Sequence, residues 1–247
     1  MRPIRKVYIV PNLVTSANLF CGFYSIIASA RGDFLTASWA ILVAAIFDSL
    51  DGRIARMAKA TSAFGVEYDS LSDLTSFGVA PGFLLYQLAL APLGRVGIAI
   101  SFLFTLCSAL RLARFNVTAS TLPKRYFQGL PTPAAANLLG TFVIFQNELG
   151  MEQIDRSGWM LFLGLSISTL MVSSVAFPSF KQFHWRSRTS VGILLVGMLS
   201  LVLILLNPEV CLFLVGSLYV AASVVWNLLW RTGVIPAPPL QIEGPRP

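Results

Sequence analysis

Four aspartates lie at helical spacings inside two apolar stretches, and they are the residues of this sequence best suited to chemistry. Asp48 and Asp51 are three positions apart, and Asp69 and Asp73 are four apart. At about 3.6 residues per turn, each spacing places both carboxylates of a pair on one helix face. Carboxylates at membrane depth are costly and therefore mark functional sites by default. If the two helices face each other, the carboxylates converge, and divalent cations that prefer oxygen ligands are the obvious means of neutralising them.

Small residues and an arginine accompany the acids, and this combination favours a phosphate ligand. Gly52 and Ala55 follow the first pair, and Gly65 precedes the second. Little side-chain bulk at such positions lets a phosphorylated ligand approach the helix backbone. Arg56 offers a guanidinium fork for phosphate oxygens. The set predicts a metal-bridged diphosphate site for phosphoryl transfer. A divalent-cation transporter is the alternative, because cation pathways also use intramembrane carboxylates.

The composition predicts an all-α, polytopic membrane protein. Of 247 residues, 55% are hydrophobic and only 12% are charged, whereas about a quarter are charged in a soluble domain. Each of eight apolar stretches approaches the roughly 20 residues that cross a bilayer. These predicted spans are 13–30, 34–57, 67–90, 96–115, 131–149, 158–177, 190–207 and 209–230. Residues 2–10 are typical of an interfacial segment, and residues 232–247 of a Pro-rich, disordered tail.

The net charge of +7 could suggest nucleic-acid binding, but the positions of the basic residues indicate membrane topology instead. If the N-terminus of an eight-span chain is inside, only Arg31, Arg95 and Arg156 lie outside, which leaves 15 of the 18 Lys and Arg residues inside. This asymmetry predicts that both termini, the tail and the acidic residues face the cytoplasm. We therefore expect membrane lipids as partners, and no nucleic acid.

The acidic constellation matches every fixed position of a known signature: Asp48-x2-Asp51-Gly52-x2-Ala55-Arg56-x8-Gly65-x3-Asp69-x3-Asp73. In this pattern the chain resembles the CDP-alcohol phosphatidyltransferases. The resemblance implies a homodimeric membrane enzyme with two divalent ions, Mg or Mn. Such an enzyme displaces CMP from a CDP-linked lipid with an alcohol nucleophile.

The resemblance also implies roles for individual residues. Asp48, Asp51, Asp69 and Asp73 are expected to ligate metal, and Asp73 to act as the base nearest the acceptor hydroxyl. The residues expected to contact the CDP-lipid are Gly52, Ala55, Arg56, Gly65 and, where the chain enters its first helix, Asn12, Thr15 and Asn18.

Further stretches resemble the integral-membrane phosphatidylserine synthases within this family. They are residues 76–81, 108–116 and 127–136. The resemblance covers about residues 10–180, the expected core of one transmembrane catalytic domain over residues 1–231, and beyond it the likeness is one of hydropathy only. It implies CDP-diacylglycerol and L-serine as substrates, with glycerol phosphate or inositol phosphate as the alternative acceptors.

The residues themselves support an amino-acid acceptor. Arg111 and Arg114 share a helix face and suit the carboxylate of serine. The alternative is that both are snorkelling anchors at the membrane surface. Asn116 could add a hydrogen bond to serine or cap the helix end.

Overall fold

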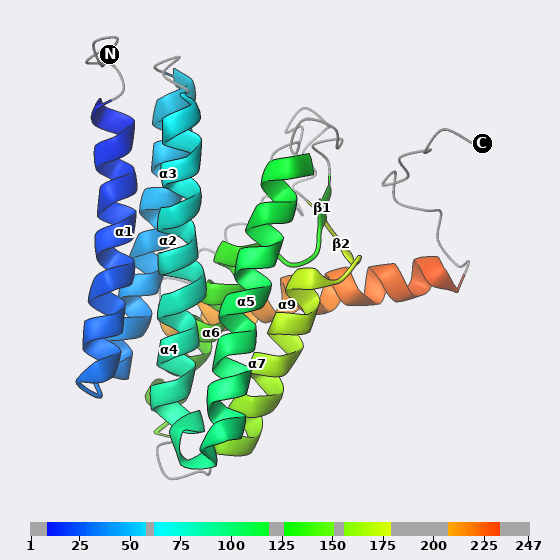
Figure 1. Ribbon diagram of the computed structural model, residues 1–247. Coiled ribbons are helices and arrows are strands. Elements are labelled where there is room, and N and C mark those ends of the chain that lie inside the picture. Colours follow the sequence, from blue (N-terminus) through cyan, green and yellow to red (C-terminus); the bar gives the residue numbers. More distant parts are fainter. Residues whose placement is uncertain (1–8, 58–61, 119–125, 151–155, 179–206, 233–247) are drawn as a thin grey trace.

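Helices make up nearly all of the described chain, and they pack as a bundle with one short sheet (Figure 1). The computed structural model describes residues 9–57, 62–118, 126–150, 156–178 and 207–232. The α-helices are α1 (Ile9–Ala30), α2 (Phe34–Met57), α3 (Ala63–Leu74), α4 (Ala80–Leu85), α5 (Arg95–Thr118), α6 (Thr132–Glu148), α7 (Arg156–Val172) and α9 (Pro208–Arg231). Two π-helical segments, η2 (Thr75–Val79) and η3 (Tyr86–Leu90), and the 3-10 turn η4 (Ala91–Leu93) join α3, α4 and α5. The predicted all-α class is confirmed, and the sheet is a small addition to it.

Five helical stretches are long and apolar enough to cross a membrane. They are Val10–Ala30, Phe34–Ile54, Ala63–Leu93, Arg95–Val117 and Glu209–Trp230, while Gly158–Val172 is apolar but shorter. Of the predicted span 190–207, all but Asn207 lies outside the described residues, as do most of the interfacial segment and nearly all of the tail. The described residues therefore give five candidate spans, and the count of eight stays a prediction.

The first five helices form the frame that carries the acidic residues. Helix α1 packs against α2 and α3, and α5 packs against α7. The turn between α1 and α2 uses Gly32 at φ 79° and Asp33, whose carboxylate accepts the Thr36 N–H at 3.0 Å and so caps α2. Hydrogen bonds from the side chain and backbone of Thr36 hold the pKa of Asp33 below its usual value. Helix α9 packs on α6 and crosses the bundle at a steep angle (Figure 1).

Serine hydroxyls hold α1 against the helix that carries the second acidic pair. Ser72 donates to the Thr15 carbonyl at 3.1 Å, and Ser76 donates to the Asn18 carbonyl at 2.9 Å. Gly22 lies so close to Ser76 that a Cβ at position 22 would collide with it. Small residues allow membrane helices to approach closely, and polar side chains then bond across them. The register between α1 and α3 is therefore fixed next to Asp73.

A short sheet replaces the end of the sixth predicted span. Helix α7 ends at Val172, not at residue 177, so that boundary was wrong. The hydroxyl of Ser173 donates to the Leu170 carbonyl at 2.8 Å and accepts the Val175 N–H at 3.3 Å, which turns the chain out of the helix. Strand β2 (Ala176–Pro178) then pairs antiparallel with β1 (Tyr126–Gln128). The chain just before α6 is thereby held to the chain that follows α7.

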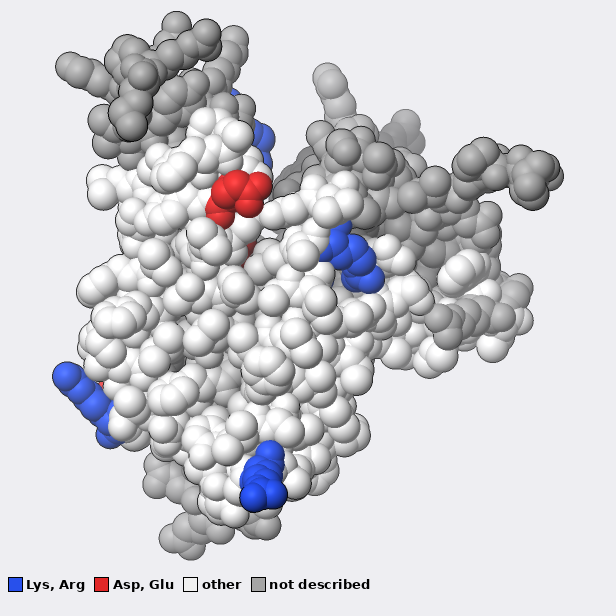
Figure 2. Space-filling view, viewed as in Figure 1, with Lys and Arg blue, Asp and Glu red and all other residues white. Residues whose placement is uncertain are grey.

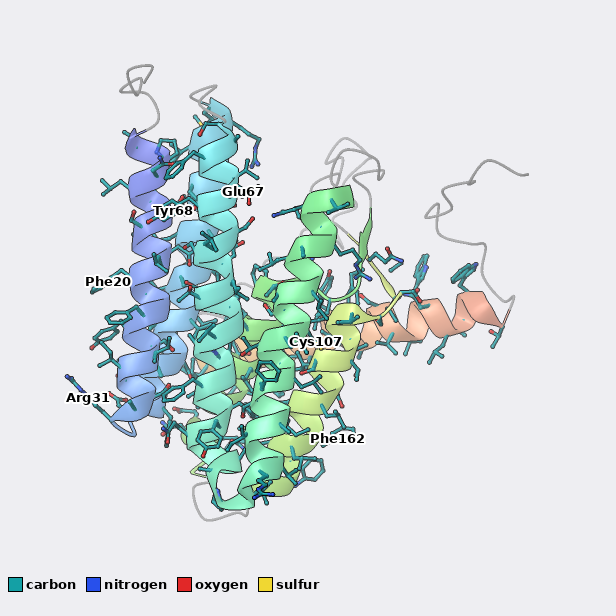
Figure 3. All side chains as sticks on the ribbon, in the orientation of Figure 1. Phe20, Arg31, Glu67, Tyr68, Cys107 and Phe162 are labelled. Atoms are coloured by element: carbon teal, nitrogen blue, oxygen red, sulfur yellow. The ribbon has the colours of Figure 1, made fainter. Side chains whose placement is uncertain are left out.

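The outer surface of the bundle is apolar over a broad band. Figure 2 shows a face that is largely free of charge across its middle, with most charged side chains toward its ends. Large apolar side chains point outward on opposite sides, as Phe20 and Phe162 do at 64% exposure each (Figure 3). A contiguous apolar surface of this extent is typical of contact with lipid rather than with water.

Candidate active site

Three of the four predicted carboxylates converge where α2 meets α3. Asp48 and Asp51 come from the last turns of α2, and Asp69 comes from the middle of α3. One oxygen from each of the three carboxylates lies within 4.8 Å of the others. The i, i+3 pair of α2 and the first acid of the i, i+4 pair of α3 therefore point at one another.

Asp73 lies one turn further along α3 and deeper in the bundle. Its carboxylate is buried, and its Oδ1 accepts a hydrogen bond from Nδ2 of Asn18 at 3.1 Å. It is close enough to Asp48 and Asp69 to interact with both electrostatically. It does not belong to the group of three within 4.8 Å, so its role as a metal ligand stays a prediction.

Two polar residues of α1 stand behind the carboxylates. The hydroxyl of Thr15 lies 2.9 Å from Oδ2 of Asp51 and 3.1 Å from the Pro11 carbonyl, and Thr15 is only 4% exposed. Asn18 bonds Asp73 in the same manner. These contacts orient the carboxylates, because a bonded carboxylate has fewer accessible rotamers. Contact of Thr15 and Asn18 with a CDP-lipid stays a prediction.

The donor set fits a hard divalent cation. All three converging groups offer carboxylate oxygens, the ligand type that Mg²⁺ and Mn²⁺ prefer. Oδ1 of Asp69 is buried and has no hydrogen-bond partner within the described part of the chain. A buried carboxylate oxygen without a donor is costly, and a bound cation would satisfy it.

The small residues of the signature sit beside polar groups on the same helices. A Cβ on Gly52 would lie 3.5 Å from Nη1 of Arg56, so the guanidinium folds back along α2. A Cβ on Gly65 would lie 3.6 Å from Oδ1 of Asn12, so α1 and α3 approach each other there. Ala55 lies on the same helix as Gly52 and Arg56, and its side chain is outside the described part.

Arg111 reaches the site from α5. It is 7% exposed, its Nη1 donates to Oγ1 of Thr132 at 2.9 Å, and it interacts electrostatically with Asp73. Its Nε has no acceptor among the residues that the structure describes. A buried guanidinium with an unused N–H beside the acidic cluster is a ready partner for an anionic ligand. The contact of Thr132 with Arg111 was not predicted from the sequence. Only the prolines on either side of Thr132 were considered, as residues at the start of a helix.

Arg114, one turn further on, has a different set of partners. Its guanidinium donates to the carbonyls of Gln128 at 2.7 Å, Val172 at 3.3 Å and Met171 at 3.4 Å. Gly129 has φ 78°, and a Cβ there would collide with the Met171 carbonyl. Arg114 thus fastens the end of α7 and the end of β1 to α5, which is a structural use of the charge. The two arginines thus have different hydrogen-bond partners, and their joint binding of serine stays a prediction.

Asn116 lies near the C-terminal end of α5 and is exposed. Its Nδ2 donates to Oγ of Ser70 at 2.9 Å, next to Asp69 on α3. Figure 2 shows an acidic and a basic side chain on the two sides of a hollow between α3 and α5. In Figure 3, Glu67 points to that side of α3, whereas Tyr68 turns toward α1, where its hydroxyl lies 2.8 Å from Oγ of Ser16. Asn116 therefore links the end of α5 to the residue that follows Asp69 on α3.

The fold and this site define a class of membrane transferase. The sequence model of the CDP-alcohol phosphatidyltransferases matches residues 8–178, which is more than half of the chain. The chain belongs to the CDP-alcohol phosphatidyltransferase family. The family resemblance read from the acidic constellation is confirmed.

Relatives narrow the comparison within this family. The chain is 37% identical over 230 residues to the CDP-diacylglycerol–serine O-phosphatidyltransferase of Helicobacter pylori strain J99, over 92% of this chain and 94% of that protein. It is 37% identical over 199 residues to a protein of the same name from Methanocaldococcus jannaschii, over 80% and 88% of the two chains. It is 36% identical over 181 residues to the archaetidylserine synthase of Methanothermobacter thermautotrophicus, over 72% of each. The first alignment is longer than the segment 8–178, so it also includes part of the chain outside that segment.

Proposed function

We propose that this chain transfers the phosphatidyl group of CDP-diacylglycerol to the hydroxyl of L-serine, which gives phosphatidylserine and CMP. The observation that carries the proposal is the convergence of three carboxylates from α2 and α3, with the buried guanidinium of Arg111 beside the fourth. The names of the relatives support serine as the acceptor.

Each part of the site has a function in this transfer. Asp48, Asp51 and Asp69 would hold the divalent metal, which we propose to be two ions of Mg or Mn. When bound, the metal would neutralise the diphosphate and the departing CMP. Thr15 holds the carboxylate of Asp51 in place. The small residues and Arg56 of α2, with Asn12 and Gly65, line the approach of the CDP-lipid.

The acceptor arrives from the side of α5 and α6. The guanidinium of Arg111 binds the serine carboxylate and directs the hydroxyl toward the lipid phosphorus. A bond forms between the serine oxygen and that phosphorus, and the bond from phosphorus to the CMP oxygen breaks. Asp73, which Asn18 holds in position, accepts the hydroxyl proton as the new bond completes.

The acceptor side fits a carboxylate better than a phosphate. Arg111 is the buried cation there, while Arg114 is engaged by three backbone carbonyls. Glycerol phosphate or inositol phosphate would bring a second negative charge and would require further cationic groups. Two of these relatives are named as phosphatidyltransferases and the third as a synthase, which disfavours the cation transporter.

Acceptor choice tests this function directly. Purified protein in detergent with CDP-diacylglycerol and Mg²⁺ or Mn²⁺ should release CMP when L-serine is added. Equal concentrations of glycerol 3-phosphate or inositol 1-phosphate should release CMP at a rate at least about ten-fold lower, because Arg111 offers one buried positive charge and a phosphate carries more negative charge than a carboxylate. Faster release with a phosphorylated alcohol would assign the chain to another branch of the family.

Removing the two arginines one at a time should separate their roles. Arg111→Ala should raise the KM for serine about ten-fold or more, because a charge-assisted bond is worth roughly 1.5–3 kcal/mol. The KM for CDP-diacylglycerol should change little. Arg114→Ala should mainly lower the melting temperature, because it releases the carbonyls of Gln128, Met171 and Val172, and it should raise the KM for serine less than Arg111→Ala does. Steady-state kinetics with each substrate varied, together with thermal melts, measure both. An unchanged serine KM in Arg111→Ala would show that this residue is an anchor.

We further propose an integral-membrane homodimer with eight spans, in which the termini and the carboxylates face the cytoplasm. The basic residues clustered toward one side support this orientation, and the family resemblance supports the dimer. Light scattering on the detergent-purified chain tests the dimer.

Cysteine labelling tests the topology. In a variant without native cysteines, single cysteines at Lys59 and Lys124 should react with an impermeant maleimide only from the cytoplasmic side. A cysteine at Glu152 should react only from the other side, and one at Gln241 only from the cytoplasm. Helix α9 crosses the bundle at a steep angle in Figure 1. The probe at Gln241, beyond α9, is therefore the sharpest test of the predicted number of eight spans. Labelling of all four probes from one side would contradict the arrangement.

A further inference from the structure

Helix α9 lies outside the segment matched by the family, yet it carries a polar face directed into the protein. Tyr219, Ser223 and Asn227 follow at i, i+4 and i+8 and so lie on one face of the helix. Ser223 and Asn227 are buried, Tyr219 is half-buried, and the neighbours Leu218 and Trp226 are exposed. Polar groups that face inward from an apolar helix of this length are costly unless they make specific bonds.

Asn227 uses its whole side-chain amide on the sheet and on its own helix. Its Oδ1 accepts the N–H of Ala176 at 2.9 Å, and its Nδ2 donates to the Ala176 carbonyl at 2.9 Å and to the Ser223 carbonyl at 2.8 Å. The amide thus pairs with both backbone groups of one strand residue, as a neighbouring strand would. It fixes the position of β2 relative to α9.

The residue held by Asn227 is linked to α5 in two steps. Ala176 lies opposite Gln128 in the sheet, and the Gln128 carbonyl accepts Nη2 of Arg114 at 2.7 Å. Arg111 lies three residues before Arg114 on the same helix. The position of α9 is therefore transmitted through the sheet to the part of α5 that presents Arg111.

A second residue of α9 packs on the sheet within electrostatic range of Arg111. The ring of Tyr219 packs against Phe177 of β2, with 5.8 Å between ring centroids and 47° between planes. Tyr219 and Arg111 are close enough to interact electrostatically. The guanidinium therefore donates to Thr132 of α6 and lies within electrostatic range of Tyr219 of α9.

We propose that α9 forms part of the acceptor side of the active site, where Tyr219 and Asn227 position Arg111 for the carboxylate of the acceptor. This inference rests on the proposed function. Both are positioning residues: Tyr219 acts on the guanidinium directly, and Asn227 acts through the sheet and Arg114. The lipid side of the site, on α1, α2 and α3, is independent of them.

The test is the separation of the two Michaelis constants. Asn227→Ala should raise the KM for serine about three- to ten-fold, and Tyr219→Phe about three-fold. Each variant loses neutral polar contacts, and the loss of such contacts weakens an affinity by about ten-fold or less. The KM for CDP-diacylglycerol should stay within about two-fold for both variants, on the same reasoning. Tyr219→Phe keeps the ring against Phe177 and so tests the hydroxyl alone if Asn227→Ala folds poorly. Trp226→Leu, an exposed change on α9, is the matched control and should alter neither constant.

A double variant shows whether Asn227 acts through Arg111. In the Arg111→Ala background, Asn227→Ala should add less than about two-fold to the serine KM, because the group that it positions is already absent. The inference would be overturned if the serine KM were unchanged in both single variants of α9. It would also be overturned if both KM values rose in parallel while the melting temperature fell. Wild-type protein that releases no CMP with serine would overturn the proposed function as well, so the two failures are distinguishable.

Discussion

Asp69→Asn should lower turnover by at least about a hundred-fold while the protein still folds. The substitution keeps the size of the side chain but removes one of three charges that converge within 4.8 Å. The Oδ1 atom of this carboxylate is buried and has no hydrogen-bond donor in the described part of the chain. Of the features of the site, this unpaired oxygen fits a bound cation best. Loss of a preorganised electrostatic group in a water-poor site commonly costs about 10²–10³ in rate.

The matched control lies two residues away on the same helix. Glu67 is an exposed carboxylate of α3, and Glu67→Gln removes the same charge outside the group of three. CMP release should stay within about two-fold of wild type for this control, because exposed charges at a distance are screened. Chelation should abolish wild-type turnover, and Mg²⁺ or Mn²⁺ should restore it. Full turnover after chelation would show that the reaction does not need a divalent metal.

Asp73→Asn should nearly abolish kcat and leave CDP-diacylglycerol affinity within a few-fold of wild type. The amide oxygen of the new side chain can still accept the hydrogen bond from Asn18, so the local structure should persist. What is lost is the proton acceptor beside the incoming hydroxyl. A free aspartate is a weak base, with a pKa near 3.9, so the proton moves late and positioning contributes most of the effect.

Metal rescue distinguishes the two roles proposed for Asp73. If the residue serves mainly as a metal ligand, nucleotide affinity should fall together with rate, and a large excess of Mg²⁺ or Mn²⁺ should restore much of the turnover. If it is the base, excess metal should restore little. Binding of CDP-diacylglycerol by isothermal titration, alongside turnover across a metal series, decides the matter on this variant. Strong rescue would exclude the base assignment.

The spacing of the acids predicted the centre of the site because that information is local. Two carboxylates at i, i+3 and two at i, i+4 must share helix faces, and the apolar stretches around them fixed the helices. The boundaries of α2 agree with the predicted span 34–57. The convergence of Asp48, Asp51 and Asp69 then needed only that α2 and α3 face each other.

The acceptor side could not be derived in the same way, because its contacts join residues far apart in the chain. Arg111 and Arg114 share a helix face, but their partners come from α6, α7 and β1. Nothing local predicts that Arg114 would bind three carbonyls, or that residues 176–178 would leave a helix to pair with 126–128. Thr15 and Asn18 were selected as ligand contacts from the family pattern, yet their bonds run to Asp51 and Asp73. The polar spacing of Tyr219, Ser223 and Asn227 was visible in the sequence, but its partner strand was not.

The amounts of phosphatidylserine and CMP formed in one reaction test the central claim most directly. Purified wild-type protein, supplied with CDP-diacylglycerol, a divalent metal and isotopically labelled L-serine, should form labelled phosphatidylserine and CMP in equal amounts, and Asp69→Asn should form neither. Mass spectrometry of the lipid and chromatography of the nucleotide measure both in one reaction. CMP without labelled phosphatidylserine would show hydrolysis of the CDP-lipid rather than transfer to serine, and would contradict the account.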